Sequence, residues 1–125
     1  MSSYLYKKDK FALMESTRQQ KVARLLQKDL GEIFQRNAME YAPSTMVTVT
    51  VVRISRDLGV AKVFLSLFAT KDKEETLSKI EKKKNEIRKE LGIRVRHQLR
   101  HVPELFFYLD DSLDYIENIE KAIKN

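Results

Sequence analysis

The sequence contains no cysteine among its 125 residues. This absence excludes disulfide bonds, thiolate metal sites and cysteine nucleophiles. The sequence also has no apolar run near the ~18 residues needed to cross a bilayer, and its start, MSSYLYKKDKF, lacks the apolar stretch of a secretory signal. No Gly-x-x-x-x-Gly-Lys-Ser/Thr sequence is present, so no phosphate-binding loop is encoded. These absences predict a cytoplasmic protein that has no membrane segment, cofactor or metal ion.

Positive charge is what the sequence has in excess, and it is unevenly distributed. The formal net charge is +6. Residues 71–101 hold eleven Lys and Arg against six Asp and Glu, whereas residues 102–125 hold two against six. Phosphate backbones attract the first segment and repel the second. The pattern favours a polyanion-binding surface on residues 71–101, with the C-terminal segment lying away from it.

Residues 71–101 also show the apolar spacing of helices. The apolar stripe is Leu77, Ile80, Ile87, Leu91, Val95 and Leu99. The opposite side carries the basic residues Lys82, Lys89, Arg96 and Arg100. Because the stripe lapses at Lys84, and because asparagine tolerates the left-handed conformation, we predict two helices that meet at a kink formed by Lys83, Lys84 and Asn85, with the lysines exposed. A continuous helix, and a solvated lysine-rich face without a ligand, are the alternatives.

The N-terminal part predicts a helix that begins at Ser16-Thr17 and ends near Asn37. Thr17 and Gln20 match a capping box. The predicted core face is Val22, Leu25, Leu26, Leu30, Ile33 and Phe34. Gly31 inside this helix predicts a close packing contact.

Three apolar segments then predict strands. In residues 45–54, Val47, Val49 and Val51 alternate with Thr48, Thr50 and Val52, which is typical of a strand with one apolar face. Residues 55–59 predict a turn in which glycine takes positive φ, and residues 60–68 complete a hairpin. Residues 105–109 predict a third strand, because Val102-Pro103 ends the preceding helical region.

The length fits one domain. Residues 1–15 predict a flexible arm, with an RNA-contacting arm as the alternative because tyrosines and lysines are interleaved there. Residues 16–125 predict an α+β domain with a three-stranded sheet that helices cover on one face. A short acidic helix at residues 112–123 closes the chain.

Three segments resemble the ribosome-binding factor A family. They are RQQKVARLLQKDLGEI, VTVTVVRISRDLGVAKVFLS and IRKELGIRVRHQLRHVPELFFYLDDSLDYIENI. The resemblance implies a type II K-homology (KH-like) fold of order α-β-β-α-α-β, with the last helix as an addition. It further implies a monomeric, non-catalytic assembly factor that binds the immature small (30S) ribosomal subunit and its 16S rRNA, and that supports late maturation and 5′-end processing of precursor 16S rRNA.

K-homology domains that clamp single-stranded RNA use a Gly-x-x-Gly loop between two helices, and this sequence has none. The family has an Ala-x-Gly kink instead, and Lys83-Lys84-Asn85 stands at that place here. Recognition by phosphate contact and by shape is therefore expected. The candidates for RNA contact are Arg18, Lys21, Arg24, Lys28, Lys82, Lys83, Lys84, Lys89, Arg96 and Arg100; Arg53 and Arg56 are weaker candidates.

Two other classes of function stay open on the residues alone. A magnesium-dependent RNA-processing enzyme would use Asp110, Asp111 and Asp114, or His97 with His101 four residues later. Carboxylates that precede a helix are, however, more often caps than metal ligands. A protein-interaction module would use the apolar face of the C-terminal helix.

Overall fold

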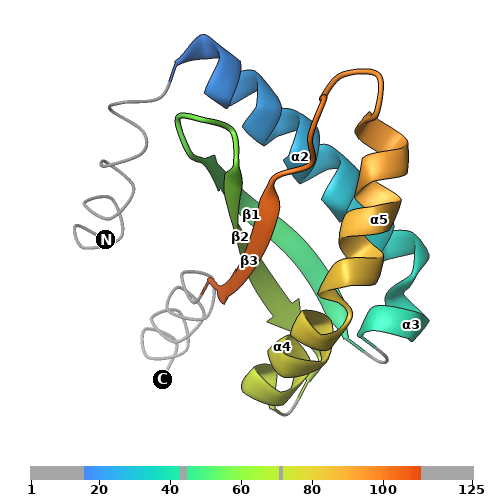
Figure 1. The fold of residues 1–125 in the computed structure, drawn as a ribbon. Coiled ribbons are helices and arrows are strands. Elements are labelled where there is room, and N and C mark those ends of the chain that lie inside the picture. Colours follow the sequence, from blue (N-terminus) through green and yellow to red (C-terminus); the bar gives the residue numbers. More distant parts are fainter. Residues whose placement is uncertain (1–15, 43–44, 71, 111–125) are drawn as a thin grey trace, which may run out of the picture.

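A three-stranded sheet organises the chain, and the helices α2 and α5 lie together on one of its faces (Figure 1). The computed structural model describes residues 16–42, 45–70 and 72–110. The elements are α2 (Thr17–Arg36), α3 (Ala38–Tyr41), β1 (Met46–Ile54), β2 (Val60–Phe68), α4 (Lys73–Lys82), α5 (Lys84–Val95) and β3 (Glu104–Leu109). Apart from the short α3, this is the predicted α-β-β-α-α-β order. The predicted N-terminal arm and C-terminal helix lie outside the described residues.

The strand order is β1-β2-β3, with β1 and β2 antiparallel and β2 and β3 parallel. The hairpin and the third strand are thus confirmed. The helix pair makes the crossover that a parallel pair of strands requires. Within the described ranges, no helix is long and apolar enough to cross a membrane.

The predicted alternation of β1 is wrong in its second half, because the register against β2 shifts between Val49 and Val51. The irregularity places Thr50 out of the regular ladder, and an extra residue in a strand exchanges the two faces beyond it. Val49, Val52 and Ile54 are therefore buried, while Val51 is only half-buried. In the hairpin turn, Leu58 takes positive φ (60°) and no glycine does, so the prediction for Gly59 is also wrong.

The helix α2 begins one residue earlier than its predicted capping box. The Ser16 hydroxyl accepts a hydrogen bond from the Gln19 amide at 3.1 Å, and the Gln19 side chain accepts one from the Ser16 amide at 2.8 Å. The Gln19 Nε2 also donates to the Ile54 carbonyl at 2.9 Å. The cap therefore ties the start of α2 to the end of β1.

Replacing Ser16 by alanine should lower the free energy of unfolding by ~1 kcal/mol, because the Gln19 amide loses the hydroxyl that accepts its hydrogen bond. Thr17→Ala is the matched control and should change stability by less than ~0.5 kcal/mol, since Thr17 is exposed. Urea denaturation of both variants measures the difference. An equal loss for the two variants would contradict the observed cap.

The core face of α2 is as predicted, except that Leu25 is only half-buried. Gln19 and Ala23 are buried as well. The predicted close contact at Gly31 is wrong, because a Cβ atom built there meets nothing within 4 Å. A glycine inside a helix costs ~1 kcal/mol relative to alanine, and packing does not explain it here.

The helix pair α4 and α5 meets at Lys83, which confirms two helices rather than one. Lys83 has φ −95° and ψ 7°, which is not left-handed, and Asn85 lies inside α5. The expected role of Asn85 in the bend is therefore wrong. The helix α5 ends at Val95, whose carbonyl accepts from the amides of Gln98 and Leu99. The helical region thus stops well before Val102-Pro103, where the sequence placed its end.

The core lies between the sheet and the helices. Its largest fully buried side chains include Leu26, Leu30, Ile33, Phe34, Val52, Ile54, Val63, Leu65, Ile80, Ile87, Leu91 and Leu105. Phe34 lies edge-on to Tyr41 and to Phe107, at centroid distances of 6.3 Å and 6.1 Å. The same residues that fix α2 and α5 on the sheet thereby orient the polar faces of both helices outward.

Candidate nucleic-acid interface

The four basic candidates on α2 lie on its outward side. Arg18, Lys21, Arg24 and Lys28 are all exposed. They recur every three to four residues, so they follow one side of the helix, while the buried stripe faces the sheet. The predicted stripe on α2 therefore exists as one cationic surface.

Four of the six basic candidates of the second region are exposed, but they do not form a single helical stripe. Lys82 is the last residue of α4 and Lys89 lies on the outward side of α5. Arg96 and Arg100 are exposed but follow the end of α5, in a turn and a bend. Ile93, an exposed apolar residue (64%), lies between Lys89 and Arg96 along the chain. The cations are thus spread over the junction, α5 and the loop behind it.

The two lysines at the junction are not simply exposed, contrary to the prediction. The Lys84 ammonium is 3.1 Å from a Glu81 carboxylate oxygen and lies over the Phe106 ring, 5.0 Å from its centroid. Lys83 is 3.7 Å from Glu86. Lys84 occupies the place where the apolar stripe lapses, and its aliphatic stem and ammonium both suit the aromatic surface of β3. Of the three consecutive lysines, only Lys82 is exposed.

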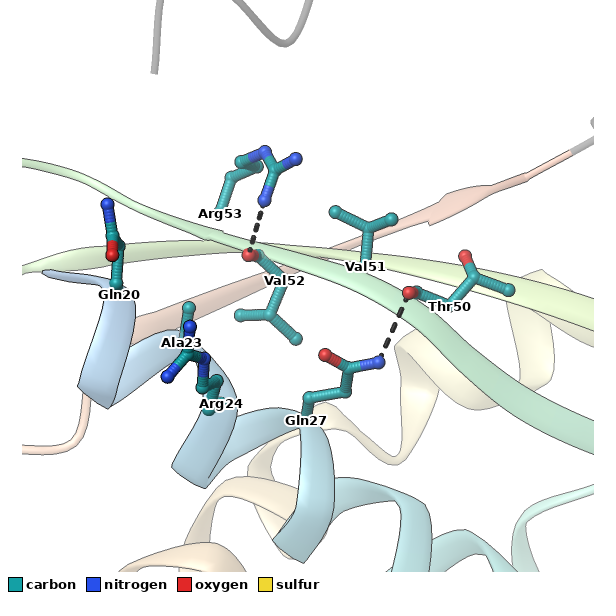
Figure 2. A pocket seen from close by; sticks show the side chains of 8 residues that line it. All are labelled: Gln20, Ala23, Arg24, Gln27, Thr50, Val51, Val52 and Arg53. Atoms are coloured by element: carbon teal, nitrogen blue, oxygen red, sulfur yellow. Dashed lines mark hydrogen bonds between the residues drawn. The ribbon is translucent and has the colours of Figure 1, made fainter. Parts of the chain in front are cut away.

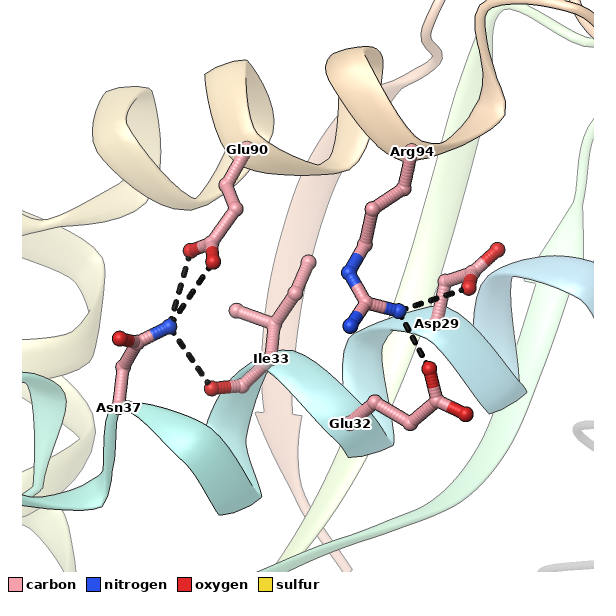
Figure 3. A network of polar contacts seen from close by, with 6 residues as sticks. All are labelled: Asp29, Glu32, Ile33, Asn37, Glu90 and Arg94. Atoms are coloured by element: carbon pink, nitrogen blue, oxygen red, sulfur yellow. Dashed lines mark hydrogen bonds and ion pairs between the residues drawn. The ribbon is translucent and has the colours of Figure 1, made fainter.

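Carboxylates lie between α2 and α5, where they form hydrogen bonds and ion pairs with basic or polar side chains (Figure 3). The Arg94 guanidinium of α5 reaches across to Asp29 at 3.0 Å and also pairs with Glu32, both on α2. Its hydrogen bond to Glu32 raises the pKa of Arg94 and lowers the pKa of Glu32, so both groups stay charged. This ion-paired group fixes α5 against α2.

A second polar contact joins Glu90, one turn before Arg94 on α5, to the end of α2 and to α3. Both carboxylate oxygens of Glu90 accept from the Asn37 side chain, at 3.0 Å and 3.1 Å, and one also accepts from the Tyr41 hydroxyl at 3.2 Å. Burial, followed by the nearby Glu90 charge, raises the pKa of Tyr41 to about 12. Since these carboxylates bind cations or donors within the protein, they repel an approaching phosphate less than free carboxylates would.

At the edge of the sheet beside α2, the side chain of Gln27 reaches the backbone of β1 (Figure 2). Gln27 donates to the carbonyls of Val49 and Thr50, at 3.3 Å and 3.2 Å. Gln19 donates to the Ile54 carbonyl. A groove lies between α2 and β1 at this edge, and Arg24 and Arg53 are among its lining residues. No pattern in the sequence predicted this groove, because its two walls come from segments that are distant in the chain.

Of the residues proposed for metal-dependent catalysis, Asp110, His97 and His101 lie in the described part of the chain. Asp110 is buried and accepts from the Thr50 hydroxyl at 2.6 Å. His97 and His101 are exposed, and the His97 ring accepts from the Arg96 side chain at 3.3 Å. Among the described residues, no three His, Asp or Glu side chains are grouped as metal ligands. Asp111 and Asp114 lie outside those residues.

Arg88 on α5 donates to two backbone carbonyls beyond the end of the helix. Its Nη2 donates to the Val102 carbonyl at 2.7 Å and its Nε to the Pro103 carbonyl at 3.2 Å. Arg88 therefore fastens the loop that leads into β3.

Comparison with known protein families gives a match over residues 18–123 to the family model described as Ribosome-binding factor A. Two curated proteins named Ribosome-binding factor A are similar over most of their length. The one from Christiangramia forsetii is 45% identical over 111 residues, which cover 88% of this chain and 85% of the relative. The one from Cytophaga hutchinsonii is 44% identical over 110 residues, which cover 88% and 83%.

Solved structures with the same fold carry the same name. The crystal structure of ribosome-binding factor A from Thermus thermophilus aligns with a TM-score of 0.62 at 24% identity, covering 73% of this chain and 94% of that one. A Thermus thermophilus ribosome-binding factor A model, fitted into a cryo-EM map of a 30S complex, aligns with a TM-score of 0.58 at 30% identity, covering 70% and 89%.

Proposed function

Because this chain belongs to the ribosome-binding factor A family, we propose that it is a non-catalytic assembly factor that binds the immature small (30S) ribosomal subunit and its 16S rRNA. In this proposal, it supports late maturation of the subunit and 5′-end processing of precursor 16S rRNA, and it acts as a monomer in the cytoplasm. The relative that was fitted into a map of a 30S complex supports the choice of partner.

The observation that carries the proposal is the exposure of cations on both helices that cover the sheet. Lys21 and Lys28 on α2, and Lys89 on α5, are exposed on helices that pack against each other on one face of the sheet. Each Lys or Arg that contacts a phosphate releases counterions, so such a surface binds RNA without reading its sequence. This agrees with the missing Gly-x-x-Gly loop.

The carboxylates between the two helices support the same proposal. Asp29 and Glu32 are ion-paired with Arg94, and Glu90 accepts from two donors. The acidic groups therefore hold α5 at a fixed place on α2. The exposed lysines on either side make the charge of the surface positive. A rigid cationic surface suits a folded RNA whose phosphates are themselves fixed.

Co-sedimentation with purified small subunits tests the proposal. The full chain should pellet with immature subunits at a concentration where it stays in the supernatant with mature ones, since the proposed partner is the immature subunit. The association should weaken with salt at a log-log slope of several units, at ~0.7 to 0.9 per neutralised phosphate. Equal binding to mature and immature subunits, or binding that salt leaves unchanged, would contradict the proposal.

A further inference from the structure

Gly31 lies in the middle of α2 without a local reason for glycine. A Cβ atom there would meet nothing within 4 Å, and its φ is not positive. Neither a close approach nor the backbone conformation therefore requires the residue. Gly31 does line a groove between α2 and the first half of β1, so a larger side chain would project into that groove.

This α2–β1 groove has a volume of about 1010 Å³. Its apolar lining includes Val47 and Met46, and 66% of the Met46 surface is exposed. Arg24 and Lys28 line its α2 side, and both are exposed. An apolar surface next to two cations suits a ligand that has a flat apolar part and a negative charge.

The groove continues along α2. Arg24 and Gln27 also line the neighbouring groove of about 280 Å³, to which Arg53 contributes (Figure 2). Among the described residues, the Nε of Arg53 is a buried donor without an acceptor. The carboxylate among the lining residues, Glu32, is already paired with Arg94. The groove itself is thus lined by two cations, Arg24 and Lys28, and one neutralised acid, and this charge favours an anion.

We propose that the α2–β1 groove binds an unpaired stretch of RNA, with one base over Gly31 against Met46 and Val47, and the adjoining phosphates at Arg24 and Lys28. This inference rests on the proposed function and adds to it a contact with single-stranded RNA. The contact lies between α2 and β1, and the lining residues of the groove include none from α4 or α5. Bases of any sequence present an apolar face, so the contact requires an unpaired strand rather than a particular sequence.

An extended acidic peptide is the other ligand with this chemistry, and the strand edge disfavours it. A peptide that adds to a sheet edge needs the free backbone groups of that edge. Among the strand residues that line the groove, the Val49 carbonyl already accepts from Gln27, so a peptide would find an acceptor of this edge occupied. The cations of the groove, in contrast, continue into the exposed Lys21 and Arg18 of the same helix.

Gly31→Leu tests the groove without weakening the fold, because leucine is a better helix former than glycine and the site has open space. We expect a melting temperature at or above that of the unmodified chain. Affinity for an unstructured oligouridine, measured by fluorescence anisotropy, should fall about tenfold, the scale of one lost base contact. Gly31→Ala is the matched control and should bind like the unmodified chain.

Ser78→Leu adds the same side chain at an exposed position of α4 and should also leave oligouridine binding unchanged. Unchanged binding by Gly31→Leu would overturn the inference, and a groove that receives a peptide instead would give this result. The proposed function fails separately: it fails if the unmodified chain does not pellet with immature subunits. If the unmodified chain pellets and Gly31→Leu still binds oligouridine fully, only the groove is wrong.

Discussion

Reversing the charge of Lys82 and Lys89 together should weaken association with immature small subunits roughly 40-fold near 0.1 M salt, if each contacts one phosphate. The estimate follows from counterion release, since the binding constant scales with salt concentration to a power of ~0.8 per contact, or about sixfold for each at this salt. Both side chains are exposed, so the fold should be unaffected. Co-sedimentation over a range of salt concentrations measures the loss, and the log-log slope should fall by ~1.6.

The single variants Lys89→Glu and Arg56→Glu make a matched pair, because each reverses one exposed charge. Arg56 lies in the hairpin turn, away from the junction of α4 and α5. Lys89→Glu should lower both affinity and salt slope, whereas Arg56→Glu should change the slope by less than half as much. An equal effect of the two would show that only net charge matters, and the helical surface would no longer be the site.

Lys83 and Lys84 are less suitable for this test, although the sequence singles them out. Reversing Lys84 would set a carboxylate beside Glu81 and over the Phe106 ring, and reversing Lys83 would oppose Glu86. Each change would disturb the junction itself as well as any phosphate contact. A loss of binding by such a variant would not separate the two causes.

Leu91→Ala should lower the free energy of unfolding by ~2 to 5 kcal/mol, a large share of the ~5 to 15 kcal/mol typical of a domain. Leu91 is completely buried and anchors α5 among the other core side chains. The loss combines the transfer of the removed carbon atoms with the cavity that remains. Guanidinium denaturation, monitored by circular dichroism, measures it.

Ile93→Ala on the same helix is the control, because it removes carbon atoms from a side chain that is 64% exposed. Its effect should stay within ~0.5 kcal/mol. Similar losses for the two variants would mean that α5 is not docked through its predicted apolar stripe. The surface that carries Lys89 would then lack the rigid support on which the proposed function depends.

The element order and the buried faces of the helices follow from the sequence alone. An amphipathic helix buries one stripe, so the spacing of Val22, Leu26, Leu30 and Ile33, and of Ile87, Leu91 and Val95, already identifies the core. The same rule located the interruption at Lys84, since no apolar residue stands there. The exposed cations of α2 followed as the opposite side of a confirmed stripe.

The features that the sequence did not reveal depend on partners that are distant in the chain. Arg94 contacts Asp29 across 65 positions, and Gln27 reaches Thr50 across 23. A local pattern records which side chains are apolar or charged, but not which charge meets which. That is why Arg94 appears as one more cation in the sequence, whereas in the fold it is neutralised.

The sequence by itself thus determined the helices, the strands, the core stripes and the basic character of the segment 71–101, because periodicity and charge are local properties. Only the tertiary structure decided which of those cations are exposed and where α5 ends. It also decided that the register shift at Thr50 exchanges the two faces of β1, and that Gly31 lines a groove. Each of these depends on packing between segments, and packing energy belongs to pairs of residues rather than to any one of them.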